Sequence, residues 1–401
     1  MTPRILYLSP HWPDRGTGAS ELRSRSIARA LRHIGDVEFI VVNDPDNAEG
    51  MAVAPAPDFN VTYSVTVSPH RNVTWGRKLR WLAAPRASYP HGCGVTDRDM
   101  RRVIHTARDF DLIWFFKLRT PNMFPCWTWT RSVVDVDDVP STYAQTLMQT
   151  AESTTERLAA AVRMISWQRR DRLLDDRFSV LGVCSENDKR YLRRLGVNKP
   201  VHVIPNGFDV PATTPVRRPS TPARFGFIGL FDYEPNLSGI QWFVRECWPA
   251  VKRAIPDARL RLLGRGSDGP LKPAGPDIDG LGWVPDAAAE MATWSGMVVP
   301  IHVGAGTRGK IAHAFSVKCP VVSTSLGAYG YDVRDGRELL LAESPADFAA
   351  ACIRIVTEPD SGEAMAERAW QQFLTHWSWT AIEPRVWATA EECLRGYHRV
   401  S

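Results

Sequence analysis

Short apolar runs alternate along the chain with longer segments in which apolar residues repeat at helical spacing. Ile5–Ser9 is the first such run, and Glu21–Ile34 is the first segment with the helical period. Further strands of the first half are predicted at Glu38–Val42, Asp111–Phe115, Ser132–Val136, Phe178–Cys184 and Val201–Ile204. Alternation of this kind is typical of a parallel sheet covered by helices.

A proline-rich segment interrupts this pattern near the middle of the chain. Asp209 to Ala223 contains four prolines together with Thr, Ser and Arg, so it can form neither a helix nor an inner strand. The alternation then resumes, with strands predicted at Arg224–Gly229, Arg259–Leu263, Gly296–Ile301 and Pro320–Thr324 and helices at Ser238–Ala254, Asp286–Trp294 and Arg308–Val317. We therefore predict an α/β protein with two similar-sized domains, residues 1–212 and 213–379, followed by a helix within residues 380–401.

Composition and cysteine usage place this protein among ordinary globular chains. The 401 residues are 44% hydrophobic and 23% charged. No apolar run reaches the roughly 18 residues of a membrane-spanning helix, and the N-terminus lacks the apolar stretch of a signal peptide. The seven cysteines are widely spaced without a CxxC pair, which favours reduced, mostly buried thiols in a cytoplasmic protein and gives no metal-ligand spacing.

The first candidate for chemistry is a glycine loop in the second half, Gly304 to Lys310. It follows an apolar strand and opens a predicted helix. Glycines let backbone N–H groups approach a ligand closely, and a helix N-terminus favours phosphate. Arg308 and Lys310 add positive charge in the same turn. The pattern predicts a diphosphate-binding loop. The alternative is a glycine loop with solvated basic residues, since its spacing differs from those of the P-loop and the dinucleotide fingerprint.

A second glycine loop, Pro10 to Ala19, follows the first strand and precedes the first long helix. In an open parallel sheet, ligands gather at the carboxyl ends of the strands. Two such loops, one in each domain, can face each other across a cleft. The alternative is a plain turn between a strand and a helix.

With these loops in place, the second half resembles the retaining GT-B glycosyltransferases of the family 4 type. The resembling segments follow in order from Arg224 to Ile382: FIGLFDYEPNLSGIQWF, PDARLRLLGRG, GLGWVPD, VPIHVGAGTRGKIAHAF, CPVVSTSLGAYGYDVRDGRELLLA and HWSWTAI. In the first half, VLGVCSENDKRYLRRLG and VHVIPNGFDV are similar to the end of that family's first domain. The likeness is weakest between about residues 45 and 108, and its specificity lies in the ordered series of motifs.

The resemblance implies two Rossmann-like domains that face each other across a cleft, with the last helix crossing back to the first domain. It implies an enzyme that moves a sugar, as hexosyltransferases do, from a nucleotide-sugar donor to an acceptor with retention of configuration. The second domain would hold the donor, and the first would hold a glycan, a lipid-linked saccharide or a small-molecule glycoside. No metal and no other cofactor is expected, because Arg308, Lys310 and the helix N-terminus supply positive charge for the departing diphosphate.

The resemblance also assigns site residues. The glycine loop would bind the donor diphosphate, through Gly304, Gly306, Thr307, Arg308 and Lys310. From the first domain, the phosphate or the transferred sugar would be approached by Gly16 and Gly18. The base would be contacted by Trp283 and Val284, and the cleft lined by the segment from Gly229 to Asn236.

Two departures from the family pattern stand out. Ala305 and His313 occupy the positions of its usual glutamate pair, so a neutral His313 replaces a carboxylate that accepts hydrogen bonds from ribose. The alternative is a helix-face histidine that contacts no ligand. In the stretch Asp135 to Asp138, Asp137 takes the place of a histidine that positions the donor sugar, and Asp138 follows it. Metal binding by this acidic stretch is disfavoured, and a capped strand end with solvated carboxylates stays open.

Two other functions remain open at this point. A nucleotide-sugar epimerase on the same scaffold would need acid and base groups, for which Asp137, Asp138 and His313 are candidates. A catalytically inactive binding protein derived from a transferase is suggested by His313. Among the remaining polar residues, Lys117 and Arg119 are expected in solvent, and the turn at Pro205-Asn206-Gly207 is expected to be a hinge.

The formal net charge of +5 is unevenly distributed. Residues 1–212 hold 29 Lys and Arg against 23 Asp and Glu, a net +6, whereas residues 213–401 hold 20 against 21, a net −1. Within the first half, His70–Arg102 carries eight basic and two acidic residues together with Trp75 and Trp81. This segment predicts contact with an anionic membrane, peripherally at its inner face, or with an acidic acceptor; a solvated face is the alternative. The basic residues do not match a nucleic-acid-binding module.

Overall fold

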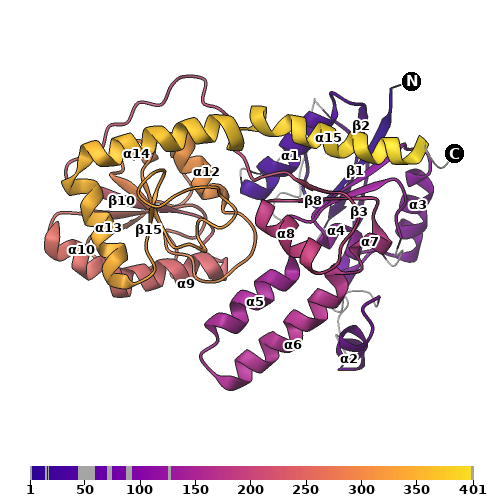
Figure 1. The fold of residues 1–401 in the computed structure, drawn as a ribbon, viewed down its shortest axis with the longest axis horizontal. Helices are drawn as coiled ribbons and strands as arrows, with labels where there is room; N and C mark the ends of the chain where they lie inside the picture. The colour runs from indigo at the N-terminus through magenta and orange to yellow at the C-terminus, as the bar shows by residue number, and fades with distance from the viewer. Residues whose placement is uncertain are drawn as a thin grey trace. The chain divides into compact units, whose positions relative to one another are not determined.

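The chain forms two compact units, each built around its own parallel sheet (Figure 1). The computed structural model describes residues 2–13, 16, 18–43, 59–69, 75–86, 93–124 and 128–398. The first unit comprises Met1–Met148, Ser153–Pro205 and Ile382–Ser401, and the second comprises Gln149–Glu152 and Asn206–Ala381. None of the described helices is long and apolar enough to cross a membrane.

The described strands of the first unit form a sheet in the order β3-β2-β1-β6-β7-β8-β9, and all neighbours in it are parallel. Their bounds are β1 (Arg4–Ser9), β2 (Asp36–Asn43), β3 (Asn60–Thr66), β6 (Leu112–Phe116), β7 (Ser132–Asp135), β8 (Val180–Val183) and β9 (Val201–Val203). The six strands predicted for this half are confirmed. The edge strand β3 was missed because polar residues alternate along it.

Helices cover this first sheet, and a short antiparallel pair, β4 (Ser68–Pro69) and β5 (Cys93–Gly94), lies outside it. The helices are α1 (Ala19–Leu31), α2 (Trp75–Ala83), α3 (Asp97–Ala107), α4 (Arg119–Asn122), α5 (Pro140–Thr150), α6 (Thr154–Asp171), α7 (Leu174–Arg177) and α8 (Glu186–Arg194). The chain's last described helix, α15 (Trp379–His398), also packs here from Ile382 onward. Trp387 Nε1 of α15 donates to the Ala30 carbonyl at 2.9 Å.

The described strands of the second unit form a parallel sheet in the order β12-β11-β10-β13-β14-β15. Their bounds are β10 (Arg224–Ile228), β11 (Arg259–Leu263), β12 (Ile278–Gly280), β13 (Gly296–Val299), β14 (Val321–Ser323) and β15 (Leu340–Leu341). The fold prediction of two parallel α/β sheets is therefore confirmed. In the central strand, Gly226 is required by close packing, because a Cβ there would lie 2.1 Å from Trp294 Cε3.

The helices of the second unit are α9 (Glu234–Trp242), α10 (Trp248–Ala254), α11 (Ala287–Met291), α12 (Gly309–Ser316), α13 (Pro345–Thr357) and α14 (Pro359–Gln372). Two π-helical turns, η2 (Phe243–Cys247) and η3 (Phe373–Trp377), follow α9 and α14. The predicted helix at Ser238–Ala254 is thus divided, since Pro249 lacks the N–H that would continue the α-helical bonding.

The cysteines fit their predicted structural role where the structure describes them. Free and buried thiols are found at Cys184, Cys247, Cys319, Cys352 and Cys393. Cys126 and the side chain of Cys93 lie outside the described part of the chain.

Candidate functional site

The predicted phosphate loop of the second unit joins β13 to α12 in a conformation that depends on glycine. Gly304 has φ 136° and Gly306 has φ 68°, both in the left-handed region. A Cβ on Gly304 would also lie 2.5 Å from Arg308 Nη2. Arg308 is the N-cap of α12, so the loop ends where the backbone N–H groups of the first helical turn begin.

Lys310 lies in this first turn, and its ammonium group is held without a counterion. Nζ donates to Asn236 Oδ1 at 2.8 Å and lies 3.9 Å from the centroid of the Phe227 ring. No carboxylate of the described residues forms an ion pair with it. Burial lowers the pKa of Lys310 well below its usual value, and the positive charge of Arg308 lowers it further. An anion at this position would relieve both effects.

Gly229 and Asn236 meet Lys310 at the carboxyl end of β10. A Cβ on Gly229 would lie 2.7 Å from Asn236 Nδ2 and 3.3 Å from Lys310 Nζ. Asn236 Nδ2 donates to the Leu230 carbonyl at 2.9 Å, which leaves its oxygen facing the ammonium group. The structure thus brings together three residues that were predicted from two separate segments.

The side chain of Arg308 folds back onto its own loop. Its Nη1 donates to the carbonyls of Ala305 and Gly306, while Nη2 is buried and has no hydrogen-bond partner. One face of the guanidinium therefore stabilises the loop, and its other terminal nitrogen retains unused donor capacity.

Two residues that the sequence analysis did not assign to the site fix this loop. Asn206 Nδ2 donates to Thr307 Oγ1 at 2.9 Å and to the Thr307 carbonyl at 3.1 Å. The Tyr331 hydroxyl donates to the Arg308 carbonyl at 2.9 Å and accepts from the Ala312 N–H at 3.3 Å. Asn206 had been interpreted as hinge structure. No local pattern in the sequence indicates Tyr331, because it follows the loop by more than twenty residues.

His313 lies one turn further along α12 and is 9% exposed. Its ring stacks on the Phe208 ring, with centroids 4.1 Å apart and planes 11° apart. Burial lowers the pKa of His313 to about 4, so the imidazole is neutral at pH 7. Its position is set by an aromatic contact within the second unit.

Trp283 and Val284 follow β12 on the same carboxyl edge. The Gly264 N–H donates to the Gly282 carbonyl at 2.8 Å, and a Cβ on Gly264 would lie 2.1 Å from the Gly229 carbonyl oxygen. The loops after β10, β11 and β12 are therefore close neighbours. Trp283 is 62% exposed, whereas Val284 packs against the core of the unit.

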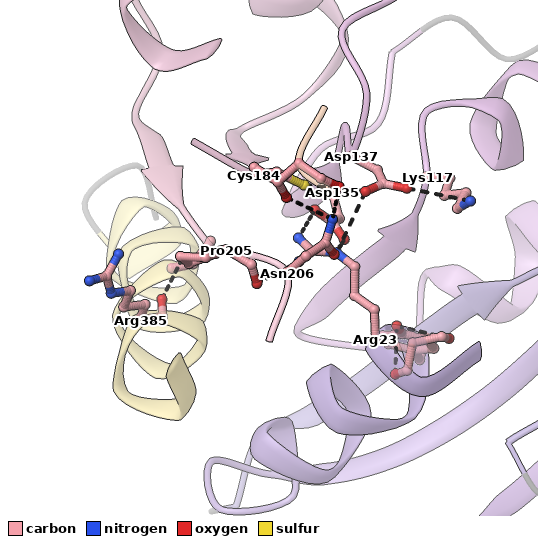
Figure 2. A network of polar contacts seen from close by, with 12 residues as sticks. Arg23, Lys117, Asp135, Asp137, Cys184, Pro205, Asn206 and Arg385 are labelled. Atoms are coloured by element: carbon pink, nitrogen blue, oxygen red, sulfur yellow. Dashed lines mark hydrogen bonds and ion pairs between the residues drawn. The ribbon is translucent and has the colours of Figure 1, made fainter. Parts of the chain in front are cut away.

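A buried ion pair underlies the candidate residues of the first unit. Arg23 of α1 donates to both carboxylate oxygens of Asp135, from Nη2 at 2.8 Å and from Nε at 3.0 Å (Figure 2). Its Nη1 donates to the Pro205 carbonyl at 2.8 Å. Asp135 is thus a structural anchor at the end of β7.

Asp137 and Lys117 lie above this anchor, in the loops after β7 and β6 (Figure 2). Both have left-handed backbones, with φ 59° and 62°, which cost about 1–3 kcal/mol each for side-chain-bearing residues. Lys117 Nζ lies 3.4 Å from Asp137 Oδ2, and Cys184 Sγ donates to Asp137 Oδ1 at 3.2 Å. Burial alone would raise the pKa of Asp137, but Lys117 and Arg23 outweigh it and lower that pKa.

The ion pair corrects one expectation. Lys117 was expected in solvent, and that prediction is wrong, because adjacent parallel strands bring it beside Asp137. Arg119 and Asp138 are exposed.

The glycine loop of the first unit brings a further pair of titratable residues to this edge. His11 Nδ1 lies 3.8 Å from Glu21 Oε1, and its Nε2 lies 2.8 Å from Ser20 Oγ. Burial lowers the pKa of His11 to about 4. A Cβ on Gly16 or Gly18 would lie 2.4 Å from a Glu21 side-chain atom, so both glycines leave room for this carboxylate. Asp14, Arg15 and Thr17 of the loop lie outside the described residues.

Known proteins resemble this chain in both sequence and fold. Residues 222–358 match the model of the family described as Glycosyl transferases group 1. The matched segment lies within the second unit, which is therefore similar to the group 1 glycosyltransferases. An uncharacterized 44.6 kDa protein in the cps region of Klebsiella pneumoniae is 29% identical over 160 residues, which span 36% of this chain and 41% of that protein. The match therefore covers less than half of that relative's length.

Solved structures extend the likeness over both units. Sucrose-phosphate synthase from Thermosynechococcus elongatus matches with 16% identity and a TM-score of 0.67, over all of both chains. HepE of Anabaena in complex with UDP-glucose matches with 15% identity and a TM-score of 0.62, over 97% of this chain and 99% of its own. WaaG, a glycosyltransferase involved in lipopolysaccharide biosynthesis, matches with 11% identity and a TM-score of 0.61, over 96% and 99%. At these identities the likeness establishes the fold.

Proposed function

We propose that this protein transfers a sugar from a nucleotide-sugar donor to an acceptor, with retention of configuration and without a metal ion or other cofactor. The observation that carries the proposal is the ammonium group of Lys310, which is half-buried beside a second cation and forms no ion pair with a carboxylate of the described residues. A diphosphate supplies the negative charge that this position lacks. The UDP-glucose bound by the GT-B protein HepE supports the same class of donor.

The donor site lies in the second unit. Lys310, the free N–H groups at the start of α12 and the available nitrogen of Arg308 stabilise the charge that develops on the departing diphosphate. Trp283 and Val284 contact the base, and His313 lies beside the ribose. Because no carboxylate nucleophile is assigned, the acceptor attacks on the face that the diphosphate leaves, through an oxocarbenium-like state.

The acceptor site lies in the first unit. Asp137 is held ionised by Lys117 and Arg23, so its oxygens accept hydrogen bonds from sugar hydroxyls. Gly16 and Gly18, in the neighbouring loop, leave room for the Glu21 carboxylate. The acceptor is a saccharide, a lipid-linked saccharide or a small-molecule glycoside.

Calorimetry with UDP, GDP, ADP and dTDP tests the donor site. We expect one of these nucleotides to bind the wild-type protein and binding to fall by about 100-fold in Lys310→Ala, as expected for a charge-assisted phosphate contact. Lys318→Ala is the matched control, because Lys318 lies in the same unit but pairs with Glu367 at 2.6 Å. Equal affinities of Lys310→Ala and the wild type would refute the assignment of the phosphate site.

His313 favours one second candidate, a nucleotide-binding protein without transferase activity. A stacked, neutral imidazole replaces a carboxylate in the donor site. Incubation of the nucleotide sugar with an acceptor panel separates the two functions, because the inactive protein binds the nucleotide without releasing a diphosphate. A changed sugar nucleotide formed without an acceptor would indicate an epimerase instead.

A further inference from the structure

A pocket of about 470 Å³ lies at the amino edge of the second unit's sheet. Ala223, Ser295 and Pro320 line it, and these residues immediately precede β10, β13 and β14. Lys310 and the glycine loop lie at the carboxyl edge of the same sheet, beyond the other ends of these strands. The pocket is therefore separate from the candidate donor site, and its volume is typical of a small-molecule site.

One wall of this pocket is the proline-rich segment that interrupts the sequence pattern. The Arg218 N–H donates to the Ala292 carbonyl at 2.9 Å. The Ser220 N–H donates to the Thr293 carbonyl, also at 2.9 Å. Two main-chain bonds thus fix the segment on the second unit. A stretch that the sequence presents only as a linker therefore shapes a wall of the pocket.

Much of the pocket's lining is apolar and poor in backbone donors. Five prolines contribute to it, and proline has no N–H group. These prolines, with the two aliphatic residues beside them, are Pro219, Pro222, Pro256, Pro320, Pro359, Ile355 and Val356. Such walls present C–H groups, and covering them with the C–H face of a ligand ring is favourable.

Arg217 brings a positive charge to these apolar walls. Its Nη2 donates to the carbonyls of Trp294 and Ser295. Its Nε is buried without a hydrogen-bond partner, and its Nη1 forms no hydrogen bond with the described residues. No carboxylate in the described part of the chain forms an ion pair with Arg217. The guanidinium group is therefore available to a carboxylate of a ligand, whose geometry it matches.

Two carboxylates limit the charge of that ligand. Asp257 and Glu363 line the same pocket at exposed positions, and neither is ion-paired with a described residue. They repel a ligand that carries several negative charges, but they accept hydrogen bonds from hydroxyl groups. Thr221 and Ser295 add hydroxyls that donate as well as accept. The lining thus suits a molecule with one carboxylate, several hydroxyls and an apolar ring face.

We propose that this pocket binds a saccharide unit with a single carboxylate, as in a uronic acid. The carboxylate pairs with Arg217, the ring lies against the prolines, and the ring hydroxyls donate to Asp257 and Glu363. A phosphate is a poorer occupant, because these two carboxylates repel its second charge. The basic segment predicted at residues 70–102 belongs to the first unit and forms no part of this site; its residues 70–74 and 87–92 lie outside the described residues.

Ligand-detected NMR of the full chain tests the proposal. The probes are glucuronate, galacturonate and the disaccharide cellobiouronate, with neutral cellobiose as the matched sugar. At least one uronate is expected to bind, and cellobiouronate about tenfold more tightly than cellobiose, because only the carboxylate forms a charge-assisted bond. Arg217→Gln is expected to remove this difference.

Gly362→Leu is expected to abolish uronate binding by filling the pocket. Gly362 lines it from α14, and a Cβ there would lie 3.7 Å or more from its neighbours, so the backbone need not move. Gly396→Leu is the matched control, because Gly396 is an exposed glycine of α15 whose Cβ would meet nothing within 4 Å. Circular dichroism checks that each variant is folded.

Three results would overturn the proposal. They are the failure of every uronate to bind, wild-type affinity in Arg217→Gln or Gly362→Leu, and competition by acetate as strong as that by glucuronate, which would make the sugar ring irrelevant. Lys310→Ala is expected to bind uronates like the wild type, because it alters the opposite edge of the sheet. The outcome is therefore independent of the proposed sugar transfer.

Discussion

Asn206 donates two hydrogen bonds to one residue, Thr307, at 2.9 Å to the hydroxyl and at 3.1 Å to the carbonyl. The preceding residue, Pro205, accepts from Arg23 with its own carbonyl at 2.8 Å. The boundary between the two units falls between Pro205 and Asn206. The chain is therefore fixed immediately before the boundary by a buried arginine of the first unit, and immediately after it by the glycine loop of the second.

Asn206 is not expected to contact the donor, but its contact with Thr307 predicts that Asn206→Ala weakens donor binding. Loss of two hydrogen bonds that hold the loop is expected to cost about 1–2 kcal/mol, or roughly 5- to 30-fold in nucleotide affinity measured by calorimetry. Asn198→Ala is the control, because Asn198 is exposed and its side chain bonds the Gly196 carbonyl. An unchanged affinity in Asn206→Ala would mean that Thr307 keeps its conformation by other contacts.

The central strands of both sheets were predictable because buried parallel strands are continuous apolar runs. β1, β6, β10 and β13 lie within two residues of their predicted bounds. The helix α6 was missed although the sequence carries a capping-box signal, Ser153 followed by Glu156, that the structure uses. Its apolar positions do not mark a single buried face, because Leu158, Val162 and Ile165 are exposed.

The candidate site was predictable to the extent that it lies within continuous segments. The glycine loop with Lys310 was found from its own spacing, and Gly229 and Asn236 through the ordered resemblance. The residues that orient them were not predicted. Asn206, Phe208 and Tyr331 are distant from the loop and α12 in sequence and contact them only in the folded chain. Likewise, the position of Lys117 beside Asp137 depends on the pairing of β6 with β7.

The lowered pKa of Lys310 predicts that nucleotide affinity falls as pH rises. In the unliganded protein the ammonium group loses its proton more readily than a free lysine, whereas a bound diphosphate stabilises its charge. Binding therefore takes up a proton in the window between the lowered pKa and the higher pKa of the complex. Calorimetry in buffers of different ionisation enthalpy measures this uptake, and Lys310→Arg is expected to abolish it, because arginine stays charged.

The lowered pKa of Lys310 also predicts that this residue makes the unliganded protein less stable, although it strengthens nucleotide binding. A folded-state pKa below that of the unfolded chain means that Lys310 destabilises the folded protein at low pH, and that this cost is relieved as pH rises above the folded-state pKa. Lys310→Met is expected to raise the Tm of the unliganded protein, by about 2–4 °C for each kcal/mol regained. A lower Tm would show that the bond to Asn236 outweighs the cost of burial.

The pair of Lys117 and Asp137 predicts a measurable coupling energy. Lys117→Met and Asp137→Asn each remove one charge, and asparagine tolerates the left-handed backbone at position 137. Chemical denaturation of the wild type, both single variants and the double variant is expected to give a coupling of about 1 kcal/mol, since the pair is only partly exposed. The exposed pair of Arg245 and Glu246 is the control and is expected to give less than about 0.5 kcal/mol. Additive effects at Lys117 and Asp137 would mean that Arg23 and Cys184 alone determine the environment of this carboxylate.

The lowered pKa of His313 predicts that the protein loses stability in acid, and that His313→Phe removes this contribution. Its folded-state pKa of about 4 lies below the ordinary value of 6.5, so the unfolded chain binds the extra proton between these two values. Stability from this residue is therefore complete above pH 6.5 and is lost as pH falls towards 4, by about 3 kcal/mol for a shift of this size. His313→Phe keeps a ring to stack on Phe208, so its unfolding free energy between pH 7 and pH 4 is expected to decline less than that of the wild type. His105→Phe, at an exposed position of α3, is the control, and an equal decline in the wild type and His313→Phe would mean that acid instability arises at other groups.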